Sequence, residues 1–199
     1  PFVGPAGRIL NGFFRNAGIN REEVYFDNVM HIRPPNDNFD WFKDNKASLL
    51  QSRQRQIIRD VKEVDPNLTI LAGNEALNAF LGHEGITKWR GSVLPHDVGK
   101  VMPITHPSWV MQWGWEPFFA LTMFDMQKAA EEMEYPQYKE PFDWKNLHIA
   151  KEENEAIRYL DEAIHSDRVA IDIESIKGYR IATMFGFCWD WEEACCIPF

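Results

Sequence analysis

The sequence predicts an α/β domain with parallel strand order, followed by the start of a second domain. Strand and helix patterns alternate over about the first 125 residues, which is typical of a parallel sheet with helices between its strands. Hydrophobic residues make up 45% of the chain and include 14 Phe and 8 Trp, enough for a packed core. Three strand-like runs then follow near the end of the chain, which predicts an antiparallel meander.

The alternation begins with a helix that contains Ile9 at helical spacing and ends at Gly18. A short strand over 24–26 runs into Asn28, and consecutive prolines and Asx residues make 33–38 a loop. Apolar residues at helical spacing then predict one amphipathic helix over Asp44–Val64, with Asp44 as its cap.

The alternation continues with strand Leu68–Ala72, helix Asn74–Leu81, strand Val101–Ile104 and helix Glu116–Met133. In parallel sheets, functional residues collect on the loops that follow the carboxyl ends of strands. Asn28 and His106 both lie in that position, so they are the first candidate site residues.

The domain boundaries follow from a polar, proline-punctuated stretch after the first domain. We expect a first domain over 1–134, a linker over 135–150 and a second domain over 151–199. An amphipathic helix over Lys151–His165 opens the second domain, and strands follow over 168–174, 180–188 and 194–199.

Charge and composition restrict the class of protein. The net charge is −9, but residues 1–113 hold 13 Lys and Arg against 12 Asp and Glu, so the acidity belongs to the later part. A nearly neutral first part permits a phosphate-binding face. We find no signal peptide and no membrane span, and three late cysteines without metal-ligand spacing suggest reduced thiols in a cytoplasmic protein. Both chain ends suggest a fragment.

Three side chains of the first domain have a chemistry suited to a nucleobase. The Asn28 amide offers one acceptor and two donors, enough to read the edge of a base. His106, followed by a proline, is a fixed donor or general acid. Phe2, beside a glycine-containing turn, can offer a stacking surface. Each of the three also has an ordinary structural explanation.

Several motifs in order raise these candidates above that explanation. They are Pro1–Gly7, then Val24–Val29 leading to Arg33-Pro34-Pro35, then Arg90-Gly91, then Pro103–Ser108. Together they resemble the motifs of family-4-type uracil-DNA glycosylases, a group that includes domains attached to phage DNA polymerases. The resemblance covers about residues 1–125 and implies a three-layer α/β/α parallel-sheet domain, acting in DNA repair as a base-flipping hydrolase.

The resemblance also implies roles for individual residues. Phe2 would stack on the extruded uracil at the turn that contains Gly4, and Asn28 would bind the Watson–Crick edge of the base. His106 would donate to O2 as the leaving base gains charge. The backbone of the Pro107-Ser108 turn would grip a neighbouring phosphate. Water attacks an oxocarbenium-like sugar, so the implied chemistry needs no metal.

This chain departs from the family pattern in three ways. The family's first motif, a Gly-Glu-x-Pro-Gly type loop with the water-positioning residue, precedes Pro1. The iron–sulfur cysteines are replaced by Ile32 and Ser48, so we predict no iron–sulfur cluster. The arginine often found soon after His-Pro-Ser is replaced by the aromatic and apolar stretch 109–113.

The second domain contains Asp172 and Glu174 two positions apart, so on a strand both carboxylates point to one face. A solvated strand face is one explanation and a divalent cation is the other. Asp-Ile-Glu-Ser resembles the first motif of DEDD 3′–5′ proofreading exonucleases of DNA polymerase I-like proteins. This implies the first strands of a ribonuclease H-like domain, in which the two carboxylates bind Mg²⁺ or Mn²⁺ once the domain is complete.

The two resemblances together predict the N-terminal part of a phage-type DNA polymerase, acting on uracil-containing DNA in a bacterial host or phage-infected cell and fused to a downstream polymerase domain. A catalytically inactive module that binds uracil or DNA is the main alternative. A structural α/β domain without a nucleic-acid role is the third.

Overall fold

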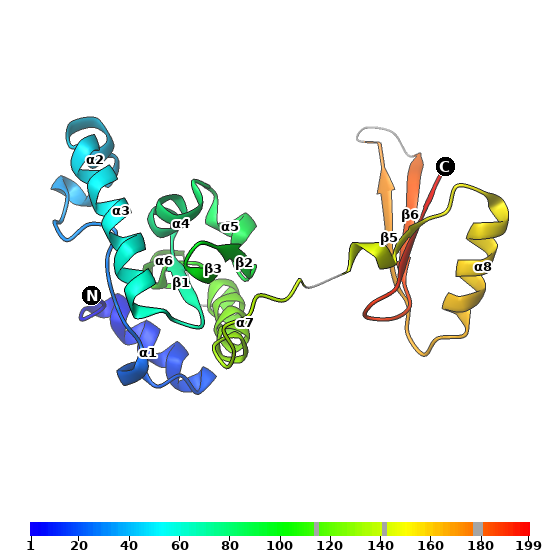
Figure 1. Ribbon diagram of the computed structural model, residues 1–199, viewed down its shortest axis with the longest axis horizontal. Helices are drawn as coiled ribbons and strands as arrows, with labels where there is room; N and C mark the ends of the chain where they lie inside the picture. The colour runs from blue at the N-terminus through cyan, green and yellow to red at the C-terminus, as the bar shows by residue number, and fades with distance from the viewer. Residues whose placement is uncertain (114–115, 141–142, 177–180) are drawn as a thin grey trace. The chain divides into compact units, whose positions relative to one another are not determined.

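The chain forms two compact units, Pro1–Tyr138 and Lys139–Phe199 (Figure 1). The computed structural model describes residues 1–113, 116–140, 143–176 and 181–199. The division between the units falls inside the stretch 135–150. The segment Leu147–Ile149, inside that stretch, pairs in the sheet of the second unit instead of forming a linker.

The first unit contains helices and short strands in alternation. Its helices are α1 (Pro5–Ala17), α2 (Asp40–Asn45), α3 (Ala47–Val64), α4 (Asn74–Leu81), α5 (Ile86–Trp89), α6 (Pro107–Trp113) and α7 (Glu116–Glu132). Its strands are β1 (Thr69–Ala72), β2 (Leu94–His96) and β3 (Gly99–Ile104). Single turns of 3₁₀-helix cover Arg21–Glu23 and Pro35–Asp37.

Helix α1 ends at Gly18 as the sequence predicts, but it begins at Pro5, within a stretch that the sequence favours as a turn. Pro5 occupies its first position, where a missing N–H costs nothing. Gly18 ends the helix in the left-handed conformation at φ 75°, and this cap bonds to the carbonyls of Phe14 and Arg15.

The sheet of the first unit has the order β1-β3-β2. β1 and β3 are parallel, with Leu71 opposite Pro103, whereas β2 runs antiparallel to β3. The mixed α/β class is confirmed, but this sheet is not purely parallel. The antiparallel strand β2 has only three residues, too few for periodicity to reveal it.

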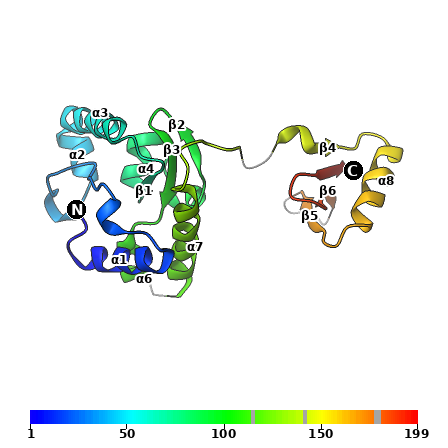
Figure 2. The same cartoon turned by 60° about the horizontal axis from the view of Figure 1, so that its bottom comes forward.

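Helices cover both faces of this sheet. On one face, Met102 and Ile104 of β3 pack with α1 and α7, whose own contributions include Phe13 and Met126. On the other face, Leu71 and Val101 pack with residues of α3 and α4. Adjacent residues of β3 therefore face opposite cores, as the strand period of two requires. Figure 2 shows α1 beside α7, away from α3 and α4.

Two predicted elements differ from the structure. The segment 24–26 is extended, with φ −102° and ψ 121° at Val24, but no strand is assigned to it. The segment 24–26 lines the same cavity as β1 but forms no backbone hydrogen-bond ladder with it. An extended segment becomes a β-strand only when it forms such a ladder. The helix predicted over Asp44–Val64 is broken at Lys46, whose φ is −142°. Lys46, not Asp44, therefore precedes the first residue of α3.

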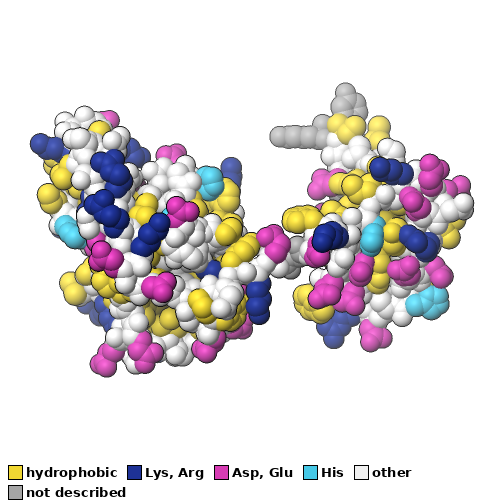
Figure 3. Space-filling view, viewed as in Figure 1, with side chains coloured by type: hydrophobic (Ala, Val, Ile, Leu, Met, Phe, Trp, Pro, Cys, Tyr) yellow, Lys and Arg dark blue, Asp and Glu magenta, His cyan; other side chains and the backbone are white. Residues whose placement is uncertain are grey.

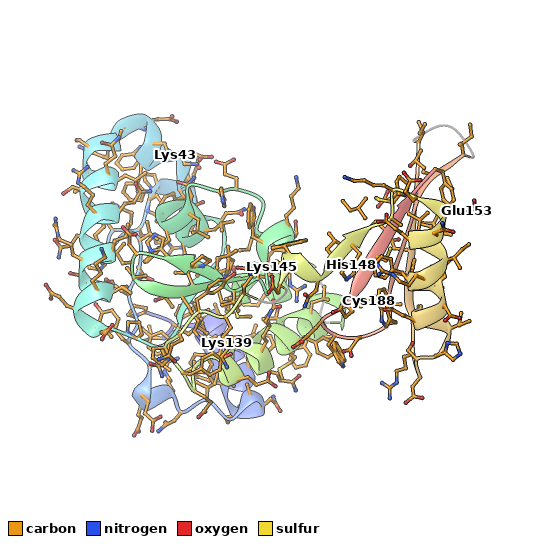
Figure 4. The ribbon with its side chains drawn as sticks, turned by 45° about the vertical axis from the view of Figure 1, so that its right-hand side comes forward. Lys43, Lys139, Lys145, His148, Glu153 and Cys188 are labelled. Atoms are coloured by element: carbon orange, nitrogen blue, oxygen red, sulfur yellow. The ribbon has the colours of Figure 1, made fainter. Side chains whose placement is uncertain are left out.

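The second unit contains β4 (Leu147–Ile149), α8 (Glu153–Ile164), β5 (Ala170–Ser175), β6 (Ala182–Cys188) and β7 (Ala194–Pro198), with a 3₁₀ turn over Trp144–Asn146. Its sheet has the order β4-β7-β6-β5. The predicted meander is confirmed, because β5, β6 and β7 are successively antiparallel. β4 is an added parallel strand, and it carries His148, which is labelled in Figure 4. The His148 ring stacks on Tyr159 of α8 with ring centroids 4.5 Å apart.

None of the helices in the described ranges combines the length and the apolar character that are required to cross a bilayer.

Candidate functional site

A cavity of about 740 Å³ in the first unit brings together three of the predicted site residues. Phe2, Asn28 and His106 all line it, although they come from separate parts of the chain. Apolar residues of α1, α3 and β1 form much of the remaining wall. A largely apolar cavity with a few polar groups is the usual form of a small-molecule site.

His106 follows β3 and lies against the end of the neighbouring strand β1. Gly73 makes this approach possible, since a Cβ on Gly73 would lie 3.1 Å from the His106 Cβ. The φ of Gly73 is +90°, a conformation that favours glycine. Its N–H donates to the carbonyl of Ile104 at 2.9 Å, which ties the two strand ends together.

Ser108 fixes the orientation of the His106 ring. The Ser108 backbone N–H donates to His106 Nδ1 at 3.2 Å, and the Ser108 hydroxyl lies 2.7 Å from the same nitrogen. A backbone N–H can only donate, so Nδ1 is an acceptor and the neutral ring carries its proton on Nε2. Burial lowers the pKa of His106, which favours this neutral form.

Phe2 packs on the His106 ring and has an unusual backbone. The two ring centroids are 5.6 Å apart and the planes are inclined by 29°. Phe26 contacts Phe2 from another side, with centroids 6.1 Å apart. Phe2 has φ 55°, in the left-handed region. Its carbonyl fills the space where Gly7 lacks a side chain, because a Cβ on Gly7 would lie 1.7 Å from that oxygen.

Asn28 is held through its backbone and not through its side chain. Its N–H donates to Asp27 Oδ1 at 2.7 Å, and its carbonyl accepts from Arg53 Nη2 at 3.2 Å. Within the described residues, the side-chain amide makes no hydrogen bond of its own. The amide is exposed and lines the cavity, so its acceptor and its donors are available to a ligand.

The other predicted contact residues of the first domain lie outside this lining. Gly4 caps the start of α1, and Pro107 and Ser108 begin α6. Pro107 has no N–H, and the N–H of Ser108 already bonds to His106. The backbone N–H of Ser108 therefore orients the histidine, and the phosphate contact of this turn stays a prediction.

The Arg90-Gly91 motif fastens α7 and does not enter the cavity. Arg90 forms a double contact with Asp125, at 2.9 Å from Nε to Oδ2 and 2.7 Å from Nη2 to Oδ1. Burial raises the pKa of Asp125 to about 6, although the positive charge of Arg90 opposes that rise. Gly91 lies beside this pair with φ +75°, a conformation that favours glycine, and a Cβ there would lie 2.6 Å from Asp125 Oδ1.

Asp172 and Glu174 belong to the second unit. They lie opposite Gly186 and Met184 in the β5–β6 ladder, so both carboxylates point to the same exposed face of β5. Across the ranges that the structure describes, no group of three or more His, Cys, Asp or Glu side chains could hold a metal ion. These two carboxylates are therefore a pair without a described third ligand.

Sequence reasoning missed a charged cluster behind Asn28. Arg53 of α3 contacts Asp27, His31 and Asp60 as well as the Asn28 carbonyl. Arg53 is separated from the Asp27–His31 stretch by more than twenty positions, so no short spacing pattern could reveal the cluster.

Comparisons with known proteins match the part of the chain that forms the first unit. Residues 1–127 match the uracil DNA glycosylase superfamily. The chain is 31% identical over 132 residues to a type-4 uracil-DNA glycosylase of Thermotoga maritima, across 65% of this chain and 66% of that protein. It is 30% identical over 120 residues to a type-4 uracil-DNA glycosylase of Archaeoglobus fulgidus, across 56% and 58%. A DNA polymerase of Bacillus phage SP01 is 25% identical over 179 residues, which cover 88% of this chain and 19% of the polymerase.

Proposed function

The chain belongs to the uracil DNA glycosylase superfamily, and on that premise we propose that its first unit excises uracil from DNA by hydrolysing the N-glycosidic bond. The observation that carries this proposal is the shared cavity of Asn28 and His106, a free amide and a neutral imidazole. The chain spans 66% and 58% of the two glycosylases described above, so activity, substrate and partners are all part of the proposal.

Asn28 selects the base by the pattern of donors and acceptors on its edge. Its amide oxygen accepts from N3–H of uracil, and its amide nitrogen donates to O4. Cytosine has an amino donor in place of O4 and no hydrogen on N3, so it presents the opposite pattern. Because these atoms pair with the opposite strand in a duplex, the base must leave the stack before Asn28 can read it.

His106 stabilises the leaving uracil. As the glycosidic bond breaks, negative charge develops on the base, and the Nε2–H of His106 donates to O2. The ring is already neutral and is already oriented by Ser108, so it needs no rearrangement as the charge forms. A preorganised donor at such a position is typically worth about 3–4 kcal/mol in the transition state.

Phe2 provides the wall of the base pocket on which uracil stacks. It lies on His106, so the position of the wall and the position of the donor are linked. Stacking of a base on an aromatic ring contributes roughly 1–3 kcal/mol and accepts any base. Phe2 therefore contributes to affinity, and Asn28 contributes to selectivity.

Lys and Arg side chains gather along α3 (Figure 3). The exposed cations of this helix include Arg55, Arg59 and Lys62. A basic strip of this kind suits the DNA backbone, and its contribution to affinity falls as the salt concentration rises.

The second unit is proposed as the start of a 3′–5′ exonuclease within a polymerase. The match to the phage DNA polymerase covers 88% of the chain, so it must extend beyond Tyr138. Asp172 and Glu174 share one open face, which suits two hard-cation ligands, and Mg²⁺ or Mn²⁺ bound there would supply an activated water. Restoration of exonuclease activity by Mg²⁺ in the full-length protein, and its loss in Asp172→Asn, tests this part.

The glycosylase proposal is tested by incubating the full-length protein with an oligonucleotide that contains one uracil. Release of free uracil supports excision. Preferential binding of the uracil strand without release favours the alternative, a reader of uracil that has no chemistry. Equal weak binding to uracil and thymine strands contradicts both.

A further inference from the structure

Arg53 of α3 makes polar contacts to the stretch that contains Asn28, while Val29 of that stretch packs in one apolar cluster with Leu50 of the same helix. Arg53 Nη2 donates to the Asn28 carbonyl at 3.2 Å and also forms an ion pair with Asp27. His31 Nε2 lies 2.6 Å from Asp27 Oδ1 and 2.8 Å from Arg53 Nη2. The arginine therefore contacts the first and last residues of the stretch 27–31 and the carbonyl of its base-reading residue.

The far side of the arginine is fixed as well. Arg53 Nη1 donates to Asp60 Oδ2 at 3.0 Å, and Asp60 lies two turns further along α3. The side chains of Arg53 and Asp27 are each only 12% exposed, so water weakens this ion pair little. Nη1 of the guanidinium is thus bonded to Asp60 on the helix, while Nη2 is bonded to the stretch that contains Asn28.

The charges in the cluster support one another. Burial opposes ionisation of Asp27, but hydrogen bonds from His31, from Arg53 and from the Asn28 N–H outweigh it and lower the pKa of this carboxyl group. Asp27 is therefore a carboxylate at neutral pH, and its negative charge is compensated by Arg53. Because Asp27 also accepts the N–H of Asn28, the backbone of Asn28 is fixed on both sides.

We propose that Arg53 is a positioning residue for uracil recognition, which holds the backbone of Asn28 so that its free amide faces the base. This inference rests on the proposed function. Asn28 makes no side-chain hydrogen bond within the described part of the chain, so its aim depends on its backbone. Two hydrogen bonds fix that backbone, one from Arg53 and one to a carboxylate that Arg53 neutralises.

The same cluster takes the place of an iron–sulfur cluster, which the resemblance to family-4-type glycosylases implies for this region. The residues present do not fit that group. Ile32 has a hydrocarbon side chain that is 60% exposed, and Ser48 has a hydroxyl, whereas a cluster needs four thiolates. The three cysteines of the chain all lie in the second unit. Ion pairs through Arg53 and the packing of Val29 with Leu50 join the Asn28 stretch to α3.

The test compares Arg53→Met with Arg55→Met in the full-length protein. Arg55 is an exposed arginine on the same helix, so its loss removes the same formal charge without disturbing the contacts of Asp27 and Asn28, and its effect on DNA affinity is measured separately. Single-turnover release of uracil separates two quantities. The amplitude reports the fraction of protein that is folded and competent. The rate constant reports how well the Asn28 amide is oriented toward the base.

We expect Arg53→Met to lower the rate constant about tenfold relative to Arg55→Met when both are measured with saturating protein. Arg53→Lys keeps the charge but cannot reach Asp27, Asp60 and the Asn28 carbonyl together, so it should recover part of the rate. A rate constant equal to that of Arg55→Met, or a loss confined to the amplitude, would overturn the positioning role.

A second readout does not depend on excision. Amide hydrogen exchange over residues 24–32 should be faster in Arg53→Met than in either the unsubstituted protein or Arg55→Met. If the unsubstituted protein releases no uracil, the proposed function fails and this exchange measurement alone decides the positioning claim. Unchanged exchange would refute it. Iron bound stoichiometrically to the purified protein would refute the replacement of the iron–sulfur cluster.

Discussion

The ring of Phe2 lies on the imidazole of His106, with centroids 5.6 Å apart, although the two residues stand near opposite ends of the first domain's sequence. This contact joins the start of α1 to the end of β3. The apolar wall of the cavity and its hydrogen-bond donor are therefore in direct contact. A substitution that displaces one of the two rings should displace the other as well.

The pH dependence of uracil release should follow the neutral form of His106. Protonation would place a hydrogen on Nδ1, where the Ser108 N–H now donates, so it would break the contact that orients the ring. Burial lowers the pKa of His106, so the rate should stay level through neutral pH and fall only below about pH 6.5. A single-turnover pH profile measures this, and a rate that rises on acidification would contradict it.

The stability of the folded protein should decrease on acidification, in the same direction as the rate of uracil release. Because the folded-state pKa is lowered, the unfolded chain takes up the proton first as the pH falls below about 6.5, and the stability that the neutral ring contributes is lost.

Ser108→Ala keeps the backbone donor but removes the hydroxyl. It should lower the rate modestly and leave uracil preference intact.

Asn28→Asp should weaken the preference for uracil over cytosine. A carboxylate in place of the amide repels O4 of uracil and accepts from the amino group of cytosine. The expected loss of discrimination is roughly 1–3 kcal/mol, measured as the ratio of binding constants for matched uracil and cytosine strands. An unchanged ratio would remove Asn28 from base recognition. The backbone bonds to Asp27 and Arg53 do not involve the changed atoms, so the fold should remain.

Gly7→Ala should displace Phe2 and slow uracil release. The added Cβ would lie 1.7 Å from the Phe2 carbonyl oxygen and 2.3 Å from its carbonyl carbon, so the backbone must move. Gly12→Ala on the same helix is the matched control, since a Cβ there meets nothing within 4 Å. It should stabilise α1 by up to about 1 kcal/mol without changing the rate. Equal rates in both variants would show that the position of Phe2 is unimportant.

Arg90→Met should destabilise the first unit by about 3–5 kcal/mol, because it leaves the buried carboxylate of Asp125 without its partner. Urea unfolding of the full-length protein measures the loss as a shift of the transition of the first unit. The double variant Arg90→Met with Asp125→Leu should recover part of it, since no buried charge remains. A double variant less stable than the single one would contradict this explanation.

The sequence predicted the regular elements where their pattern is long or their ends are marked. Helix α4 begins and ends as expected, and Gly18 ends α1 as its left-handed conformation requires. Elements such as β2 and α5 were missed, since three or four residues carry no periodicity. The break at Lys46 has no signal in the apolar pattern, since Phe42 of α2 and Leu50 of α3, on either side of it, pack in the same apolar cluster.

The sequence named three residues that the structure brings to one cavity, but it did not reveal their contacts. Phe2, Asn28 and His106 were named from ordered motifs, and the fold brings them to one cavity. The roles of Ser108 and Arg53 depend on three-dimensional proximity alone. Ser108 was expected to contact phosphate, whereas its N–H is used by His106, and the contact between Arg53 and Asn28 exists only because α3 folds back along the loop.

The most direct test is single-turnover release of uracil from a labelled oligonucleotide with a single uracil, comparing the full-length protein with its His106→Ala variant. We expect release by the unsubstituted protein and a rate about 10²–10³-fold lower in His106→Ala, with DNA binding nearly unchanged. Equal losses of rate and binding in His106→Ala, or release that survives the substitution, would contradict the assignment of His106 as the donor to the leaving base.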